Sequence, residues 1–186
     1  MGTKTTLSWE QFLKAGKEWE RWEYVDGEVK FMSPHMGGKH AELVMKICRA
    51  ANRFVDKHPE WIGFPTDVAF TMAGGSWRCP DWGLIRRERF GERGIPEGPV
   101  PFPPDVAFEV ISQHDTRSDI QSKRDEYSLN GVIQVWADPQ KQAVELISPI
   151  HGVRTFTEGQ TVVIEELPGF ELTMFPAIAG ESKSVL

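Results

Sequence analysis

One short apolar run that carries a single carboxylate constrains the fold of this chain more than any other feature. The segment PPDVAFEVISQHD (103–115) opens with prolines, continues as an apolar stretch and ends in polar residues. This length and these borders are typical of a central strand over 105–112. A carboxylate buried in such a strand costs several kcal/mol unless it is paired or binds a cation. Glu109 therefore either faces water or meets a positive group.

The segments around this strand alternate between helical and strand patterns. Apolar residues at helical spacing predict a long helix over 40–59, and a second helix is expected over 117–131. Two β-rich runs flank Asp26-Gly27, a two-residue turn signal, and predict a hairpin over 21–32. The remaining expected elements are a short helix over 7–16, strands over 62–72, 76–85, 132–138 and 142–148, short strands within 152–172, and a long irregular loop over 86–104.

The order of these elements predicts a single domain. No linker divides the 186 residues, and helices alternate with strands, so we expect one α/β domain over 1–186 with a mixed sheet flanked by helices. An N-terminal helix and hairpin (8–33) precede the core (36–147), and added strands (153–175) follow it.

Composition and charge limit the classes of function. A net charge of −6 argues against non-specific nucleic-acid binding over the whole surface but leaves a local basic patch open. No run approaches the ~18 apolar residues of a membrane span, and the first residues lack the apolar segment of a signal peptide. Cys48 and Cys79 have no metal-like spacing, which favours reduced cysteines in a cytoplasmic protein.

Strand geometry selects the carboxylate that can share a site with Glu109. Asp105 lies on the same strand face but about 13 Å away at ~3.3 Å per residue, too far to chelate one ion. Asp81 follows Pro80, which suits the start of a strand because it has no backbone donor. Side chains on neighbouring strands do converge, and a divalent cation relieves the repulsion between two carboxylates. Asp81 is therefore the expected partner.

A site of this kind also requires an amine, which orients water or stabilises developing charge. Ile111, two residues beyond Glu109 on the same face, does not supply one. Lys123 lies in the following predicted helix with Ile120 and Tyr127 on its face, and its stem is long enough to reach the sheet. A solvent-exposed lysine in the charged run KRDE is the alternative.

The ordered set of these segments resembles the restriction-endonuclease-like family called Uma-two, within the PD-(D/E)XK nuclease superfamily. The resemblance covers nearly the whole chain, and its segments follow in the family's order. The matching features are WEYVDGEVKFMSP, His40 at the start of the long helix, CPDWGLI, PPDVAFEVIS, SKRDEYSLNGVIQVWADP and LPGFEL.

This resemblance implies a restriction-endonuclease-like α/β core that cleaves phosphodiester bonds in DNA with Mg²⁺ or Mn²⁺. It assigns Asp81 and Glu109 as metal ligands and Lys123 as the lysine that has moved from the strand to the helix. Glu23 matches an early acidic position and is either a third catalytic carboxylate or a surface residue of the hairpin. A homodimer is expected, because nucleases that cut both strands pair two active sites by symmetry.

The chain departs from the resembled pattern at two positions. Ile111 stands where the superfamily has its strand lysine, a departure that the family generally shows. Gln113 replaces the proline expected after Ser112. An alternative from another class is therefore kept: a non-catalytic DNA-binding or assembly module that retains the nuclease fold.

Four further residues are candidates for substrate binding. His40 is either a surface residue of the first helical turn or a phosphate contact. Arg86 and Arg87 open RRERFGER, which has four arginines against two glutamates and is either a phosphate contact or a solvated loop. Tyr127, on the Lys123 face of its helix, completes the set.

Overall fold

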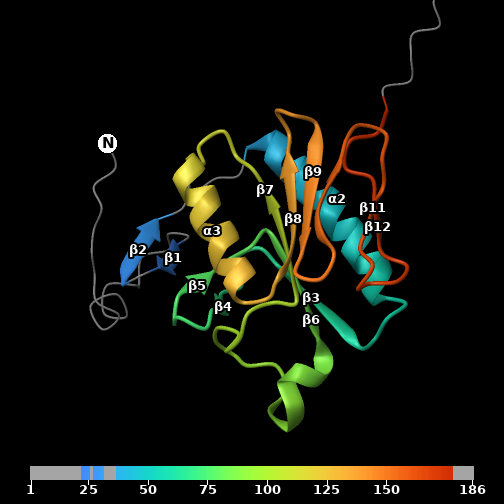
Figure 1. Cartoon of the computed structure of the whole chain (residues 1–186). Helices are drawn as coiled ribbons and strands as arrows, with labels where there is room; N and C mark the ends of the chain where they lie inside the picture. The colour runs from blue at the N-terminus through green and yellow to red at the C-terminus, as the bar shows by residue number, and fades with distance from the viewer. Residues whose placement is uncertain (1–21, 26, 32–36, 178–186) are drawn as a thin grey trace, which may run out of the picture.

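The computed structural model describes residues 22–25, 27–31 and 37–177, and a six-stranded mixed sheet forms the centre of the molecule (Figure 1). The strand order is β10-β9-β8-β7-β6-β3, in which β7 and β8 are parallel and all other neighbours are antiparallel. Its strands are β3 (Trp61–Pro65), β6 (Trp82–Arg86), β7 (Val106–Val110), β8 (Ile133–Asp138), β9 (Ala143–Ser148) and β10 (Gly152–Phe156). Strand β7 has a neighbour on each side, so the predicted central strand is confirmed.

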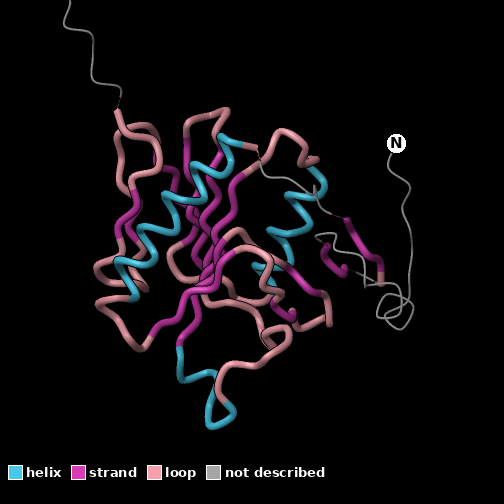
Figure 2. Tube along the Cα trace, turned by 180° about the vertical axis from the view of Figure 1, so that it is seen from behind, coloured by secondary structure: helices cyan, strands magenta, loops and turns pink. Residues whose placement is uncertain are grey.

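One long helix covers each face of this sheet. Helix α2 (Gly38–Val55) lies in front of the sheet in Figure 2, and α3 (Arg117–Leu129) lies in front of it in the opposite view of Figure 1. The apolar stripe of α2 packs against alternate residues of β6, β7 and β8, as expected for an amphipathic helix over a sheet. Both helices agree with the predicted spans.

Helix α3 forms the crossover between the parallel strands β7 and β8, a connection that parallel strands require. Its first turn is capped by Thr116, whose side chain accepts a hydrogen bond from the backbone N–H of Asp119 (3.1 Å). Tyr127, in the third turn, is fully buried against the sheet. The side chains of this helix face are thereby held over β7.

The predicted strands over 62–72 and 76–85 are wrong in extent, because each divides into two. Asp67 has a φ of 74°, and Pro80 lacks a backbone donor, so neither run continues in one sheet. The end of the first segment (70–71) and the start of the second (77–78) pair with each other and join the N-terminal hairpin in a second sheet, of order β2-β1-β5-β4. Its strands are β1 (Trp22–Val25), β2 (Glu28–Phe31), β4 (Phe70–Thr71) and β5 (Trp77–Arg78). The predicted hairpin is confirmed as the antiparallel pair β1–β2.

The remaining segments complete the core. The predicted irregular loop contains the 3₁₀-helix η1 (Arg87–Arg93). The strands β11 (Val162–Val163) and β12 (Glu171–Leu172) pair with each other, and their segment joins the core beneath α2. The predicted helix over 7–16 lies outside the described residues. Of the helices described, none is long and apolar enough to cross a bilayer.

Candidate active site

Glu109 is a carboxylate enclosed between sheet and helix. Strand β7 has helices over both of its faces, so Glu109, on the α3 side, is only 6 % exposed. Its Oε1 accepts a hydrogen bond from the hydroxyl of Tyr127 (2.8 Å). The ammonium of Lys123 lies 3.3 Å and 3.4 Å from its two oxygens. Of the two alternatives for Glu109, the structure therefore shows a positive group, Lys123, whose side chain is 15 % exposed and so is not the solvated lysine of the alternative interpretation.

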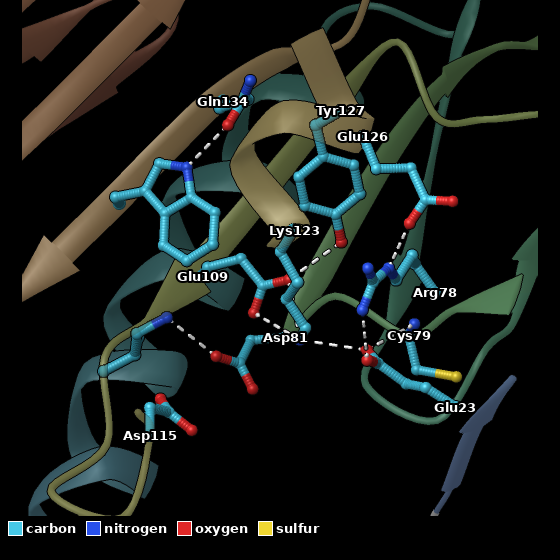
Figure 3. A network of polar contacts seen from close by, with 12 residues as sticks. Glu23, Arg78, Cys79, Asp81, Glu109, Asp115, Lys123, Glu126, Tyr127 and Gln134 are labelled. Carbon is cyan, nitrogen blue, oxygen red and sulfur yellow. Dashed lines mark hydrogen bonds and ion pairs between the residues drawn. The ribbon is translucent and has the colours of Figure 1, made fainter. Parts of the chain in front are cut away.

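Lys123 bridges two acidic side chains from different sheets. Its Nζ lies 3.0 Å from Oε1 of Glu23, on β1, as well as beside Glu109 (Figure 3). Lys123 and Tyr127 are four residues apart in α3, so both reach Glu109 from one helix face. The helix thus supplies the amine that is missing at Ile111.

Asp81 lies immediately before β6, beside Glu109. The pair Trp82↔Phe108 fixes the register of β6 against β7, and Asp81 and Glu109 are the next residues beyond this pair. The backbone N–H of Val110 donates to Oδ2 of Asp81 (2.8 Å), which holds the carboxylate at the edge of β7. The predicted juxtaposition of the two acids on neighbouring strands is present.

His40 and Glu23 complete the surroundings of these acids. His40, in the first turn of α2, places Nε2 3.1 Å from Oδ1 of Asp81, and this hydrogen bond raises the pKa of the imidazole. Glu23 is 4 % exposed, so its alternative as a hairpin surface residue is wrong. Its oxygens already accept from Arg78 Nη1 (3.0 Å), the Cys79 backbone N–H (3.3 Å) and Lys123.

Burial and charge pull the pKa values in this cluster apart. Burial and the nearby Asp81, against the lowering effect of Lys123, together raise the pKa of Glu109 to about 7. Burial alone would lower the pKa of Lys123, but Glu109 and Glu23 raise it above its ordinary value. Burial would raise the pKa of Glu23, but Lys123 and Arg78 hold it below its ordinary value. The ammonium of Lys123 thus lies between two carboxylates that differ in pKa: Glu23, whose pKa is lowered, and Glu109, whose pKa is raised to about 7.

Two predicted substrate contacts lie away from this cluster. Arg86 stacks over the ring of Trp61 (4.4 Å), and Nε of Arg87 donates to the carbonyl of Pro59 (3.0 Å). Arg86 is the last residue of β6 and Arg87 follows it, so they lie about 16 Å and about 20 Å from Asp81 at ~3.3 Å per residue. Asp105, at the other end of β7 from Glu109, pairs instead with Arg89 (2.8 Å).

Sequence reasoning missed the buried arginine beside Glu23. Arg78 is 1 % exposed and contacts Glu23, Glu126 and Ser122. The available signal was a lone arginine in SWRCPD, a run with strand character. Its partners lie 44 to 55 residues away along the chain, so no local pattern joined them.

The donor set fits a hard divalent cation such as Mg²⁺ or Mn²⁺ better than a softer ion that prefers thiolate or imidazole ligands. Within the described ranges, no group of three or more His, Cys, Asp or Glu side chains is arranged to hold a metal ion. The carboxylates of Asp81 and Glu109 are two oxygen donors on adjacent strands. Mg²⁺ is typically bound by one or two carboxylates together with substrate phosphates and water. Asp81 and Glu109 would hold such an ion.

Comparison with known proteins identifies the family. A protein-family model described as "Uma2: Putative restriction endonuclease" matches residues 9–174. The chain belongs to the Uma2 family. The resemblance stated from the sequence is thereby confirmed, and it spans β1 to β12.

One solved structure supports the fold of this Uma2 chain. A crystal structure described as "a putative nuclease belonging to DUF820" from Anabaena variabilis ATCC 29413 matches with a TM-score of 0.76 and 19 % identity, covering 90 % of this chain and 95 % of that one. The predicted restriction-endonuclease-like α/β fold is confirmed by this match. A DrdV–DNA complex matches with a TM-score of 0.35 and 13 % identity, over 62 % of this chain and 12 % of that one. No curated protein gives a significant match.

Proposed function

We propose that this protein is an endonuclease that hydrolyses phosphodiester bonds in DNA with Mg²⁺ or Mn²⁺. One observation carries the proposal: the ammonium of Lys123 lies 3.3 Å from the carboxylate of Glu109, beside Asp81 on the neighbouring strand. Membership of the Uma2 family and the printed description of the Anabaena structure support the same reaction class.

Asp81 and Glu109 hold the divalent cation in this proposal. When bound, the cation would polarise a phosphate oxygen and acidify a water molecule. The backbone N–H of Val110 fixes Asp81, and the hydroxyl of Tyr127 fixes Glu109. Both carboxylates are therefore preorganised before substrate binds.

Lys123 stabilises the charge that develops on the phosphate. Its ammonium has three donors and is fixed beside the carboxylate pair by Glu23 and Glu109. A preorganised positive group in a site that excludes water stabilises a transition state more strongly than the same group in water. Glu23 acts here by orienting the lysine.

His40 and the two arginines bind DNA at different distances from the reaction. His40 adjoins Asp81 and contacts the phosphate that is cleaved or its neighbour. Arg86 and Arg87 contact the DNA backbone farther along the duplex, since they lie at the opposite end of β6 from Asp81. We also propose a homodimer, which would cut both strands, and a cytoplasmic location, which a chain with only two cysteines favours.

Cleavage of supercoiled plasmid tests this proposal. The wild type should nick or linearise plasmid with Mg²⁺ or Mn²⁺ and stop when EDTA is added. Asp81→Asn should abolish cleavage and leave the fold intact, whereas Asp125→Asn, an exposed acid on α3, should cut at the wild-type rate.

Two results would contradict the proposal. An Asp81→Asn protein that cuts as fast as the wild type would remove Asp81 from the reaction. A wild type that binds DNA and cleaves no plasmid, linear or single-stranded DNA with either metal would favour the non-catalytic DNA-binding or assembly module.

A further inference from the structure

Arg78 lies at the centre of a buried ion network that no role in the reaction yet explains. It comes from β5, and its guanidinium donates to three side chains on two other elements. Nη1 donates to Glu23 Oε2 (3.0 Å), Nη2 to Ser122 Oγ (3.0 Å), and Nε to Glu126 Oε2. Ser122 and Glu126 both belong to α3, on either side of Lys123 in sequence.

These contacts form a row of alternating charges that ends at the proposed metal site. The order is Glu126, Arg78, Glu23, Lys123 and Glu109, each in contact with the next (Figure 3). Glu23 uses Oε2 for the arginine and Oε1 for the lysine. Arg78, at Oε2, and the backbone N–H of Cys79, at Oε1, thus hold the carboxylate that contacts Lys123.

Stability alone gives a poor account of this network. Replacing a buried ion pair by packed apolar residues is often neutral or stabilising. A planar guanidinium, however, can hold two carboxylates and a hydroxyl in fixed directions, which an ammonium cannot do. What an arginine supplies here, and a lysine would not, is a fixed orientation of the side chains of Glu23, Glu126 and Ser122.

We propose that Arg78 is a positioning residue for the cleavage reaction: it fixes Glu23, and Glu23 holds the Lys123 ammonium against Glu109. This inference rests on the proposed nuclease function. It predicts that a substitution at Arg78 lowers kcat because the Lys123 ammonium is displaced, and that no other group mediates the effect.

The first test is a double-mutant cycle on DNA cleavage. Arg78→Lys keeps the positive charge but removes the planar guanidinium with its fixed donor directions. It should lower kcat about tenfold or more and leave KM within about twofold of the wild type. The reason is that a small displacement of a reacting group lowers the rate strongly. In the background of Lys123→Met, Arg78→Lys should have no further effect on kcat. The matched control is Arg154→Lys, an arginine paired with Glu165, which should leave kcat unchanged.

Two kinetic results would overturn the inference. A wild-type kcat in Arg78→Lys would show that the guanidinium geometry does not affect turnover. An equal loss in the presence and absence of Lys123 would show that Arg78 acts through another group.

The second test does not depend on activity. The ¹⁵N-labelled wild type should give an ammonium signal for Lys123 in its NMR spectrum, assigned by its loss in Lys123→Met. This signal should shift or disappear in Arg78→Lys, and an unchanged signal would overturn the inference. If the wild type cleaves no substrate, the proposed function fails, and this spectrum alone decides the role of Arg78.

Two milder variants cover the case in which Arg78→Lys does not fold. Ser122→Ala and Glu126→Gln each remove one outer contact of the guanidinium and leave Glu23 and Lys123 in place. Each should lower kcat by a smaller factor than expected for Arg78→Lys and should have no effect in Lys123→Met. Full activity in both would overturn the inference.

Discussion

Strand β7 presents different chemistry to its two helices. Toward α2 it presents Val106, Phe108 and Val110, all buried in the larger apolar cluster. Toward α3 it presents Ala107 and Glu109, and Glu109 accepts hydrogen bonds from Lys123 and Tyr127 of α3. The same backbone therefore supports an apolar face and a charged face within five residues.

The two faces differ in what burial does for them. Removing the ring of Phe108 from water stabilises the fold, whereas removing the carboxylate of Glu109 from water costs free energy unless a counter-charge offsets it. The α2 face thus holds the sheet together, and the α3 face carries a set of buried charges that are paired with one another. Stability and activity should respond separately to changes on the two faces.

The largest expected effect on stability comes from the apolar face. Phe108→Ala should lower the free energy of unfolding by about 3–5 kcal/mol, because it removes a fully buried ring and leaves a cavity. Urea unfolding followed by circular dichroism measures this. Cleavage by the protein that remains folded should stay near the wild-type rate. Val163→Ala, at an exposed apolar position, is the control and should change little. A loss below 1 kcal/mol for Phe108→Ala would show that the apolar face of β7 does not dominate the stability of the fold.

The charged face should respond in turnover. Lys123→Met should lower kcat by roughly 10²–10³, the usual effect of removing one preorganised donor, and should spare metal affinity. Lys141→Met, at a lysine that is 77 % exposed, is the matched control. Single-turnover cleavage and Mn²⁺ titration measure the two quantities. Unchanged turnover would mean that Lys123 only neutralises Glu109.

The free energy of unfolding should depend on pH because of Glu109 on the charged face. The folded pKa of Glu109 is raised to about 7 from the 4.5 of the free side chain, so the folded protein binds more protons between these values. Its free energy of unfolding, measured in EDTA, should therefore fall as pH rises through this window, by about 3 kcal/mol in total. Glu109→Gln should flatten this part of the profile. A wild-type profile that matches the variant would show that Glu109 ionises normally.

The fold and the proximity of Asp81 to Glu109, the pair proposed to bind metal, were accessible from sequence because their signals are local. The run around Glu109 predicts a central strand, and Pro80 marks the start of the strand that carries Asp81. Neighbouring strands bring these acids together, so strand geometry sufficed. The long helix α2 was predicted because apolar residues repeat at helical spacing.

The remaining features depend on contacts between distant segments. Nothing near Arg78 in sequence indicates that its partners come from β1 and α3. The alternatives for Glu23 and Lys123 stayed open for the same reason: only tertiary packing decides whether a polar residue of a hairpin or helix faces water. The divisions within 62–72 and 76–85 depend on a positive φ at Asp67 and on Pro80, which compete with strand propensity.

A calorimetric scan with and without Mn²⁺ tests the central claim most directly, namely that Asp81 and Glu109 form a cation site on the charged face. A cation that binds only the native state at a hundredfold excess over Kd adds about 2.7 kcal/mol of stability, roughly 5–10 °C in Tm for a chain of this size. The wild type should show this rise, Glu109→Gln should lose most of it, and Asp125→Asn should keep it. A wild-type Tm that does not change at millimolar Mn²⁺, or a full rise in Glu109→Gln, would contradict the account.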